Sequence, residues 1–454
     1  MSTIAADPVS PSAKTLAPEP FSGLSWARLS QFGFSLTDQA LSVGGMFVAN
    51  VALARTVSKE EYGMFALSYS VFTFLAGLHN AAILETYTIY GAGRYHEQNR
   101  EYSWLIWRSN ALLCFALTVL LLVAWRILAL TSPMYASRSL LGLAIASGVI
   151  LSAALLRRML YVKRAPRIAA RFSLIFFVSV LAMLGVSIRA GILNGLTVFL
   201  IVAAGWILGG IFVARELPVL TSVDAFREAQ PNHWKEHWKY ARWVLATAFV
   251  FQFTTQGYYW LLAGFLSLKQ VAQLRVIYLL VTPIDQVLSA ITLLVLPIMS
   301  FHFASRRTDL LLKFWKKYLG ATLAITGLFA ICVWLLGHRV LHLVYGGKFD
   351  EVAGLLSILV FLPIVTGAGN TMNAASKAME KPQFVLYGYI AGGVATLLGG
   401  IPLVVALGLR GAVWGMILSG AAYTAALGVG FSSVANPSIH RMPVPAESAT
   451  LVGD

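Results

Sequence analysis

The sequence predicts an all-α polytopic membrane protein, and three of its properties support this fold class. Of its 454 residues, 58% are hydrophobic and 12% are charged, and the mean hydropathy is +0.74, which is too apolar for a chain surrounded by water. Runs such as 33–54 and 242–266 reach the roughly 20 apolar residues that cross about 30 Å of hydrocarbon as a helix. These runs lack the apolar–polar alternation of a membrane β-barrel, so their backbone groups must be paired within helices.

About twelve such runs divide the chain into two six-helix lobes. We expect the N-lobe at 33–214 and the C-lobe at 242–431, with a cytoplasmic interfacial linker at 215–241 between them. A cytoplasmic segment, 1–32, precedes the first span, and a disordered cytoplasmic tail, 432–454, follows the last. The expected spans lie at 33–54, 62–90, 104–125, 139–160, 168–188, 193–214, 242–266, 271–300, 315–337, 351–376, 384–407 and 411–431.

The distribution of charge orients this chain in a bacterial inner membrane. A net charge of +15 in a membrane protein is typical of basic cytoplasmic loops, so we expect no nucleic acid partner. With the N-terminus inside, 24 of the 34 Lys and Arg residues fall on the cytoplasmic side, which predicts that both termini are cytoplasmic. The densest basic group either sets this topology or binds anionic lipid head groups or a substrate diphosphate. It comprises Arg157, Arg158, Lys163, Arg164, Arg167 and Arg171.

Residues 233–240 of the linker predict a helix lying in the cytoplasmic interface, and no metal or cofactor site is indicated there or elsewhere. His233 and His237 have the spacing of a zinc pair, but no Glu follows the first His and no third ligand is near. The two cysteines, Cys114 and Cys332, lie in apolar runs and suggest neither a disulfide nor a metal site. We therefore expect no bound cofactor.

An internal repeat relates the two lobes. Residues 53–61, which join the first expected span to the second, align without a gap to residues 262–270, which join the seventh to the eighth. The offset from 53 to 262 is 209 residues, and a polar, Ser-containing turn lies at the same point of each segment. Two parallel halves of this kind are found in transporters with two lobes around a central cleft.

Residues 36–95 carry a family resemblance in three groups. These are Asp38-Gln39-Ala40, then Leu53-Ala54-Arg55 followed by Glu60-Glu61-Tyr62-Gly63, and finally Leu84-Glu85 with Tyr90-Gly91-Ala92-Gly93-Arg94-Tyr95. In these groups the chain resembles the polysaccharide transporter (Wzx-type flippase) family of the multidrug/oligosaccharidyl-lipid/polysaccharide (MOP) exporter superfamily. The resemblance implies a MATE-like, V-shaped architecture with alternating access, in which the first, second, seventh and eighth spans line the cleft. It also implies an undecaprenyl-diphosphate-linked oligosaccharide as the substrate.

Polar side chains within these four spans are the candidate site residues, because burying unpaired polar groups in hydrocarbon is costly. The candidates for the substrate cavity are Asp38, Gln39, Asn50, Asn80, Gln252, Gln256, Arg275 and Gln286. Each could instead hold helices together by hydrogen bonds. Glu85 and Asp285 are the candidate coupling carboxylates for H⁺ or Na⁺, with a structural ion pair as the alternative. Arg275 either contacts phosphate or extends to the membrane surface.

Three functions are compatible with these features. The favoured one is a flippase that moves a polyprenyl-diphosphate-linked oligosaccharide to the periplasmic leaflet for exopolysaccharide, capsule or O-antigen synthesis. A polysaccharide polymerase complex is then a candidate partner. The alternative is a multidrug or cation antiporter of the same superfamily. A membrane enzyme is not expected, because the longest connection, 215–241, is too short for a catalytic domain.

Overall fold

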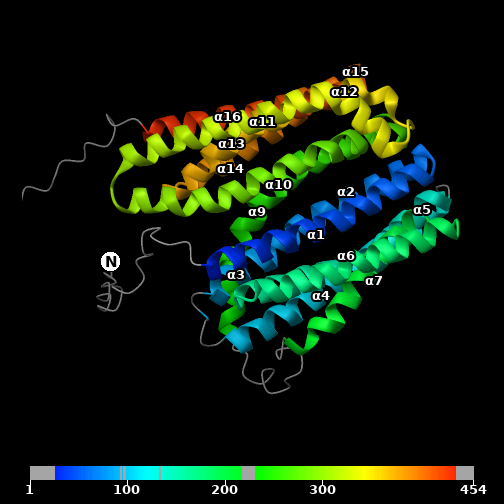
Figure 1. Ribbon diagram of the computed structural model, residues 1–454, viewed down its shortest axis with the longest axis horizontal. Coiled ribbons are helices and arrows are strands. Elements are labelled where there is room, and N and C mark those ends of the chain that lie inside the picture. Colours follow the sequence, from blue (N-terminus) through cyan, green and yellow to red (C-terminus); the bar gives the residue numbers. More distant parts are fainter. Residues whose placement is uncertain (1–25, 93–94, 96–98, 132–133, 217–230, 436–454) are drawn as a thin grey trace, which may run out of the picture.

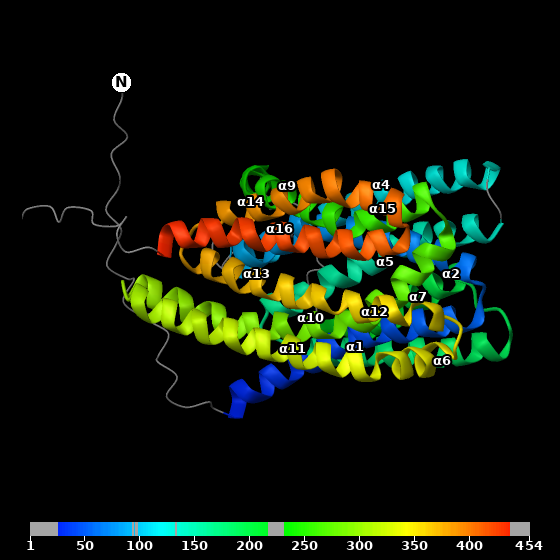
Figure 2. The same cartoon turned by 90° about the horizontal axis from the view of Figure 1, so that it is seen from above.

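The computed structural model describes residues 26–92, 95, 99–131, 134–216 and 231–435. The expectations for most of the N-terminal segment, the middle of the linker and most of the C-terminal tail lie outside these described residues. The described chain is almost entirely helical, and the start of its first helix and the end of its last lie at the same end of the bundle (Figure 1, Figure 2). This placement agrees with an even number of spans.

Each predicted span corresponds to a helical segment of the structure. Those of the N-lobe are α1 (Trp26–Thr56), α2 (Lys59–His79) with the π-helix η2 (Asn80–Glu85) and α3 (Thr86–Ala92), α4 (Asn99–Thr131), α5 (Met134–Val162), α6 (Pro166–Arg189), and α7 (Gly195–Val213) with η3 (Ala214–Glu216). Those of the C-lobe are α9 (Pro231–Phe265), α10 (Leu268–Ala304), α11 (Thr308–Tyr345), η5 (Asp350–Val352) with α12 (Ala353–Leu359) and α13 (Phe361–Ala378), α14 (Gln383–Ala395) with the π-helix η6 (Thr396–Gly400) and α15 (Ile401–Leu407), and α16 (Leu409–Ala435).

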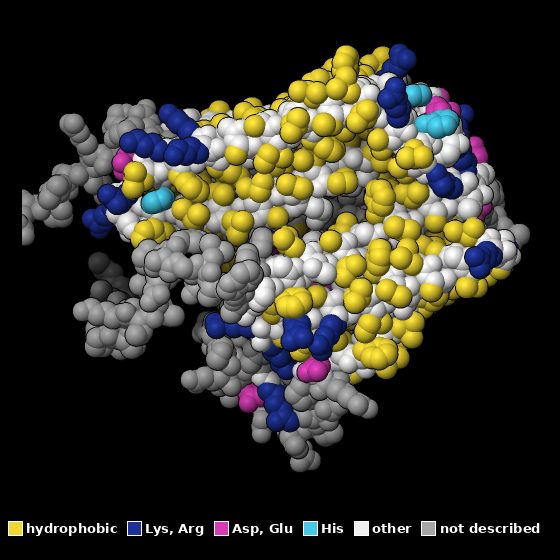
Figure 3. Space-filling view, viewed as in Figure 1, with side chains coloured by type: hydrophobic (Ala, Val, Ile, Leu, Met, Phe, Trp, Pro, Cys, Tyr) yellow, Lys and Arg dark blue, Asp and Glu magenta, His cyan; other side chains and the backbone are white. Residues whose placement is uncertain are grey.

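The all-helical membrane class is confirmed. In the described part of the chain, ten helical segments are long and apolar enough to cross a membrane; the two remaining spans, α1 and α9, are the first and the seventh. Large apolar side chains such as Phe115, Leu343 and Leu398 are at least 70% exposed. Figure 3 shows hydrophobic side chains over the middle of one face and Lys and Arg near the helix ends. Water would not tolerate such a surface, whereas lipid matches it.

The repeat offset recurs in the helix boundaries. α1 ends at Thr56 and α9 ends at Phe265, 209 residues later, and the same offset separates Lys59 and Leu268, the first residues of α2 and α10. Ser58 caps α2 by accepting a hydrogen bond from a backbone N–H at 3.1 Å, whereas the equivalent Ser267 makes no such bond. The two halves therefore have the connection between their first two helices at the same position, but only the N-terminal half caps its second helix with a serine side chain.

The linker expectation differs from the structure at one point. Residues 231–241 do not lie as a separate helix in the interface but form the first turns of α9, which continues to Phe265. His233 and His237 are buried against the N-lobe, whereas Trp234 and Trp238 stay partly exposed. The helix is extended because its buried face is anchored on another lobe, which local sequence does not reveal.

Candidate translocation site

The lobes meet where α2 packs against α9 and α10. Three of the four helices expected to line a cleft therefore form the interface. α1 packs mainly on α6 within the N-lobe and reaches the C-lobe through polar side chains.

α9 runs from one lobe to the other. In its second turn, His237 contacts the carbonyl of Ala82 through Nε2 and the hydroxyl of Tyr102 through Nδ1, both at 2.8 Å. Because a carbonyl can only accept, Nε2 carries a proton, and Nδ1 of the neutral ring accepts from Tyr102. Toward its other end, Tyr258 bonds Ser419 of α16 at 2.8 Å. The start of α9 is thus fixed to the N-lobe, and its later turns belong to the C-lobe.

At the end of the interface where α2 and α10 begin, each lobe caps a helix of the other. Arg55 at the end of α1 donates through Nε to the carbonyl of Val344 in the last turn of α11, at 2.7 Å, and through Nη2 to the preceding carbonyl. Lys348, after α11, donates to the carbonyl of Ala54 at 2.9 Å and to that of Val57. The last carbonyls of a helix lack partners within the helix and attract cations. We call these two contacts the crossed caps.

Two further contacts tighten this end. Lys59 of α2 forms an ion pair with Glu351 of η5 at 2.5 Å. Gly63 of α2 lies directly on the backbone of Leu268, where an added Cβ would come within 1.9 Å of the carbonyl oxygen. Burial and the neighbouring Lys59 charge lower the pKa of the Lys348 ammonium. At this end the two lobes are therefore in contact, and α2 lies directly against the backbone of α10.

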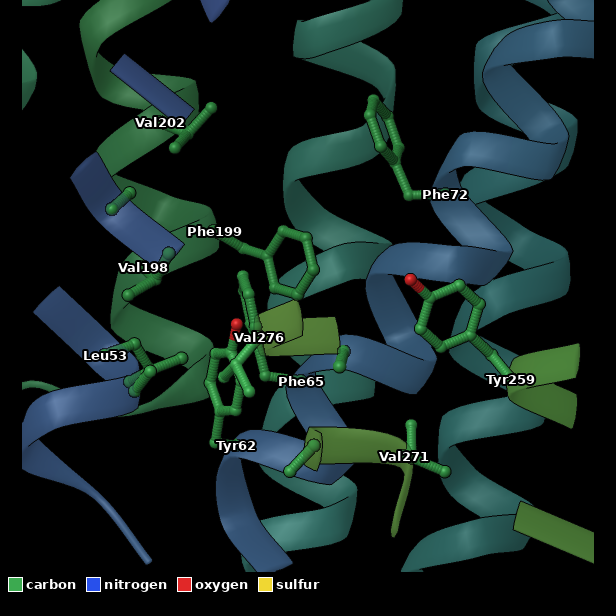
Figure 4. Packing of buried hydrophobic residues seen from close by; sticks show 14 of the residues in the cluster. Leu53, Tyr62, Phe65, Phe72, Val198, Phe199, Val202, Tyr259, Val271 and Val276 are labelled. Carbon is green, nitrogen blue, oxygen red and sulfur yellow. The ribbon is translucent and has the colours of Figure 1, made fainter. Parts of the chain in front are cut away.

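Arg275 of α10 lies within this closed interface. Its side chain is buried, its Nε donates to Asn50 of α1 at 3.3 Å, and its guanidinium lies 4.4 Å from the centre of the Tyr69 ring. Tyr62 and Tyr259 also interact with its charge, and Figure 4 shows both in the surrounding core. Among the described residues no carboxylate forms an ion pair with Arg275. The candidates Asn50 and Arg275 are thus brought together across the lobes.

Asp38 of α1 is fully buried inside the N-lobe and has four hydrogen bonds. Arg157 of α5 donates to both carboxylate oxygens, at 2.6 and 3.1 Å, Tyr161 donates at 2.7 Å and Ser173 at 2.5 Å. This pairing neutralises the carboxylate and assigns Arg157, which the sequence placed in a surface basic cluster, to the interior. Asp38 is thus part of a paired network within the lobe.

The candidates Asn80 and Glu85 are the two ends of the π-helix η2. Arg158 donates to Asn80 Oδ1 at 3.3 Å, and the exposed Glu85 interacts electrostatically with Arg158, Tyr240 and Tyr389. The last two side chains belong to α9 and α14, so Glu85 faces the C-lobe. Widened helical turns of this kind are frequent at functional sites.

The four candidate glutamines differ in their contacts. Gln39 donates to Gln286 at 3.2 Å and so links α1 to α10 across the lobes. The Gln252 amide lies against Gly77 of α2, where a Cβ would come within 1.8 Å of it. Gln256 is half-buried one turn further along α9. Two pairs of α1 and α10 candidates, Asn50 with Arg275 and Gln39 with Gln286, therefore meet between the lobes.

A cavity of about 570 Å³ lies inside the C-lobe, among α9, α10, α13, α14 and α16. Its lining combines aromatic, aliphatic, hydroxyl and amide side chains. The charged residues among the lining are Asp285 and Lys377. Asp285 is half-buried near the middle of α10 and has no hydrogen-bond or ion-pair partner within the described chain, whereas Lys377 is exposed in the last turn of α13.

Most of this cavity lies outside the four spans in which the sequence predicted site residues. Asn373 donates to the hydroxyls of Tyr389 and Tyr423, at 3.3 and 3.0 Å, and Tyr423 in turn donates to Asn370 at 3.1 Å. A signal was present, since Asn370, Asn373 and Lys377 follow one another at the i, i+3, i+7 spacing of one helix face.

The fold is similar to the folds of several solved membrane transporters. The chain is similar to an inward-facing multidrug resistance MATE family transporter (TM-score 0.74, 12% identity, covering 88% of this chain and 98% of that one). It is also similar to the lipid II flippase MurJ in an inward closed conformation (TM-score 0.71, 14% identity, 88% and 87% covered). The TM-score with an outward-facing MATE transporter is 0.64, at 12% identity over 89% and 95% of the chains. No family model and no curated protein matches the sequence.

Proposed function

We propose that this protein is a flippase that moves a polyprenyl-diphosphate-linked oligosaccharide from the cytoplasmic to the periplasmic leaflet of a bacterial inner membrane. The product would serve exopolysaccharide, capsule or O-antigen synthesis. The fold supports transport, because flippases and exporters share it. The closed end would face the periplasm, and the similarity to an inward-facing MATE family transporter supports this state. The polymerase and anionic lipids remain the expected partners.

One observation supports this substrate class above others. Arg158 of α5 and Arg275 of α10 are hydrogen-bonded to the amides of Asn80 and Asn50, and among the described residues neither forms an ion pair, although the Glu85 carboxylate interacts with Arg158 at longer range. A carboxylate would cancel the charge, whereas an amide leaves it available to an anion. Asp38, the buried acid of the N-lobe, is already neutralised by Arg157. These two arginines, one in each lobe, therefore favour a diphosphate over a cation.

The decisive experiment measures in which leaflet the lipid-linked sugar is exposed in a strain lacking the gene. We expect the repeat unit to accumulate in the cytoplasmic leaflet and surface polysaccharide to disappear, with drug sensitivity unchanged. Normal periplasmic exposure in that strain would contradict the proposal.

The orientation needs its own test, because it decides which end releases substrate. In a variant without Cys114 and Cys332, a Cys placed at Ser305, between α10 and α11, should be labelled from the cytoplasm. A Cys at Gly191, between α6 and α7, should be labelled from the periplasm. The reverse pattern would invert the proposed direction.

A multidrug or cation antiporter is the second candidate, and Asp285 favours it. An unpaired carboxylate in a cavity with aromatic walls can attract an organic cation. Cells lacking the gene would then lose resistance to cationic drugs. Whichever cargo is carried, Asp285 and Glu85 remain the proposed coupling carboxylates for H⁺ or Na⁺.

A further inference from the structure

The C-lobe cavity has the composition of a carbohydrate site. Sugar rings offer apolar faces that pack on aromatic rings and hydroxyls that both donate and accept hydrogen bonds. The Tyr389 and Tyr423 rings stack at 5.2 Å with an interplanar angle of 11°, and the Phe251 ring lies 5.1 Å from Tyr389. These three side chains form an aromatic wall of the cavity.

The polar groups beside this wall are positioned before any ligand binds. Asn373 donates to both tyrosine hydroxyls, so the aromatic pair is held by a buried amide. The Tyr423 hydroxyl donates to Asn370 Oδ1, which leaves the NH₂ group of Asn370 as a donor. Asp285 supplies an unpaired acceptor, and the cavity thus offers both donors and acceptors around one ring-sized wall.

The positive charge of Lys377 favours a sugar phosphate over an organic cation as the ligand of this cavity. It lines the same cavity as Asp285, so their two charges sum to zero. A cationic drug would be repelled by this ammonium, whereas a phosphate attached to a sugar would pair with it. Because Lys377 is exposed and Asp285 is half-buried, the phosphate would remain at the mouth while the sugar lies inside.

We propose that the C-lobe cavity binds the sugar that is joined directly to the diphosphate, with Lys377 at the phosphate and Asp285, Asn370 and Tyr389 around the ring. The inference rests on the proposed flippase function and refines it. The two lobes then divide the head group: the sugar lies in the C-lobe, and the rest of the diphosphate faces Arg158 of the N-lobe.

Saturation-transfer NMR on the purified full chain tests the proposal, with glucose 1-phosphate and N-acetylglucosamine 1-phosphate as probes. We expect the ring protons of at least one probe to receive saturation. Tyr389→Leu should abolish this transfer, and the matched control Tyr387→Leu should not, because Tyr387 is exposed and lies outside the cavity lining. If neither probe is saturated, or if both variants bind equally, the sugar site is wrong.

Lys377 provides a second test that does not depend on folding, since its side chain is exposed. Lys377→Gln should weaken the sugar phosphates roughly tenfold through loss of a charge-assisted contact and leave the free sugars unchanged. The control Lys381→Gln should bind like the original protein. Equal weakening of free sugars, or displacement of the probes by tetraphenylphosphonium, would overturn the assignment. A negative result alongside normal flipping in cells would refute the cavity assignment and leave the flippase proposal intact.

Discussion

Each lobe contains an aspartate within a long helix, and the two carboxylates differ in burial and in partners. In the N-lobe, Asp38 accepts four hydrogen bonds from Arg157, Tyr161 and Ser173 and has no exposed surface. In the C-lobe, Asp285 lines a cavity of about 570 Å³ and has no partner in the described chain. A paired charge in the interior stabilises its lobe, whereas an unpaired one is available to a proton, an ion or a ligand.

The surroundings of the two aspartates account for this difference. In the N-lobe, Arg157, Tyr161 and Ser173 are bonded to Asp38, while the C-lobe has a cavity beside α9 and α10. Depth in a span therefore does not identify a coupling residue. Both aspartates lie within long helices, and their partners decide which one can function.

Removing Asp38 should have the largest effect of the changes considered. Asp38→Ala would leave the Arg157 guanidinium, whose side chain is only 19% exposed, without its counter-ion, at a cost of about 3–5 kcal/mol. We expect little folded protein and a lower thermal unfolding midpoint in detergent. Asp309→Ala, at an exposed acid, is the control. An unchanged midpoint together with lost transport would make Asp38 a site residue instead of a structural one.

The sequence predicts the fold well because a membrane span is a local property. Every expected span is helical, and the repeat offset of 209 recurs at Thr56 and Phe265. The upstream start of α9 was missed, because those turns pack against the N-lobe through His237 and Tyr102.

The candidate site is less predictable, because it depends on which residues meet. Asp38 and Arg157 are 119 positions apart, and composition alone does not pair them. Asn50 and Arg275 are separated by 225 positions. The sequence predicts that both lie in the four helices of the cleft, but it does not predict their contact. The cavity also requires α13, α14 and α16, and the polar stripe that indicates it, Asn370, Asn373 and Lys377, lies on α13.

Arg275 of α10, which hydrogen-bonds Asn50 of the N-lobe, tests whether this contact between the lobes belongs to the site. Arg275→Ala should weaken transport by the equivalent of about 1.5–3 kcal/mol, the value of a desolvated charge-assisted contact. Arg275→Lys should retain part of the activity, because the charge remains and only the planar fork is lost. Both are measured by complementation and leaflet-resolved flipping, with Arg339→Ala at an exposed position as control. Full activity of Arg275→Ala would remove this residue from the site.

The crossed caps test how firmly the lobes are joined at the closed end. Replacing Arg55 and Lys348 together by Gln keeps a donor at each position but removes both charges. We expect the closed state to lose roughly 1–2 kcal/mol, which shifts the ratio of open to closed molecules by about five- to thirtyfold. Spin labels at the exposed Glu60 and Lys269 should then report longer distances. An unchanged distance distribution, equal to that of the control Lys313→Gln, would show that the caps do not hold the lobes.

Asp285 should show the smallest effect on stability and a large one on transport, which completes the contrast with Asp38. Asp285→Asn leaves no partner unpaired, so we expect the unfolding free energy to change by less than about 0.5 kcal/mol. Asn keeps one acceptor oxygen for a sugar hydroxyl but cannot take up and release a proton. Coupling through this residue therefore predicts a transport loss of at least about tenfold in Asp285→Asn, with sugar phosphate binding retained.

Glu85→Gln is the parallel variant in the N-lobe, and Asp309→Asn is the control. If Asp285→Asn and Glu85→Gln both complement a deletion strain fully, neither carboxylate couples transport, and Asp285 keeps only its proposed role at the sugar.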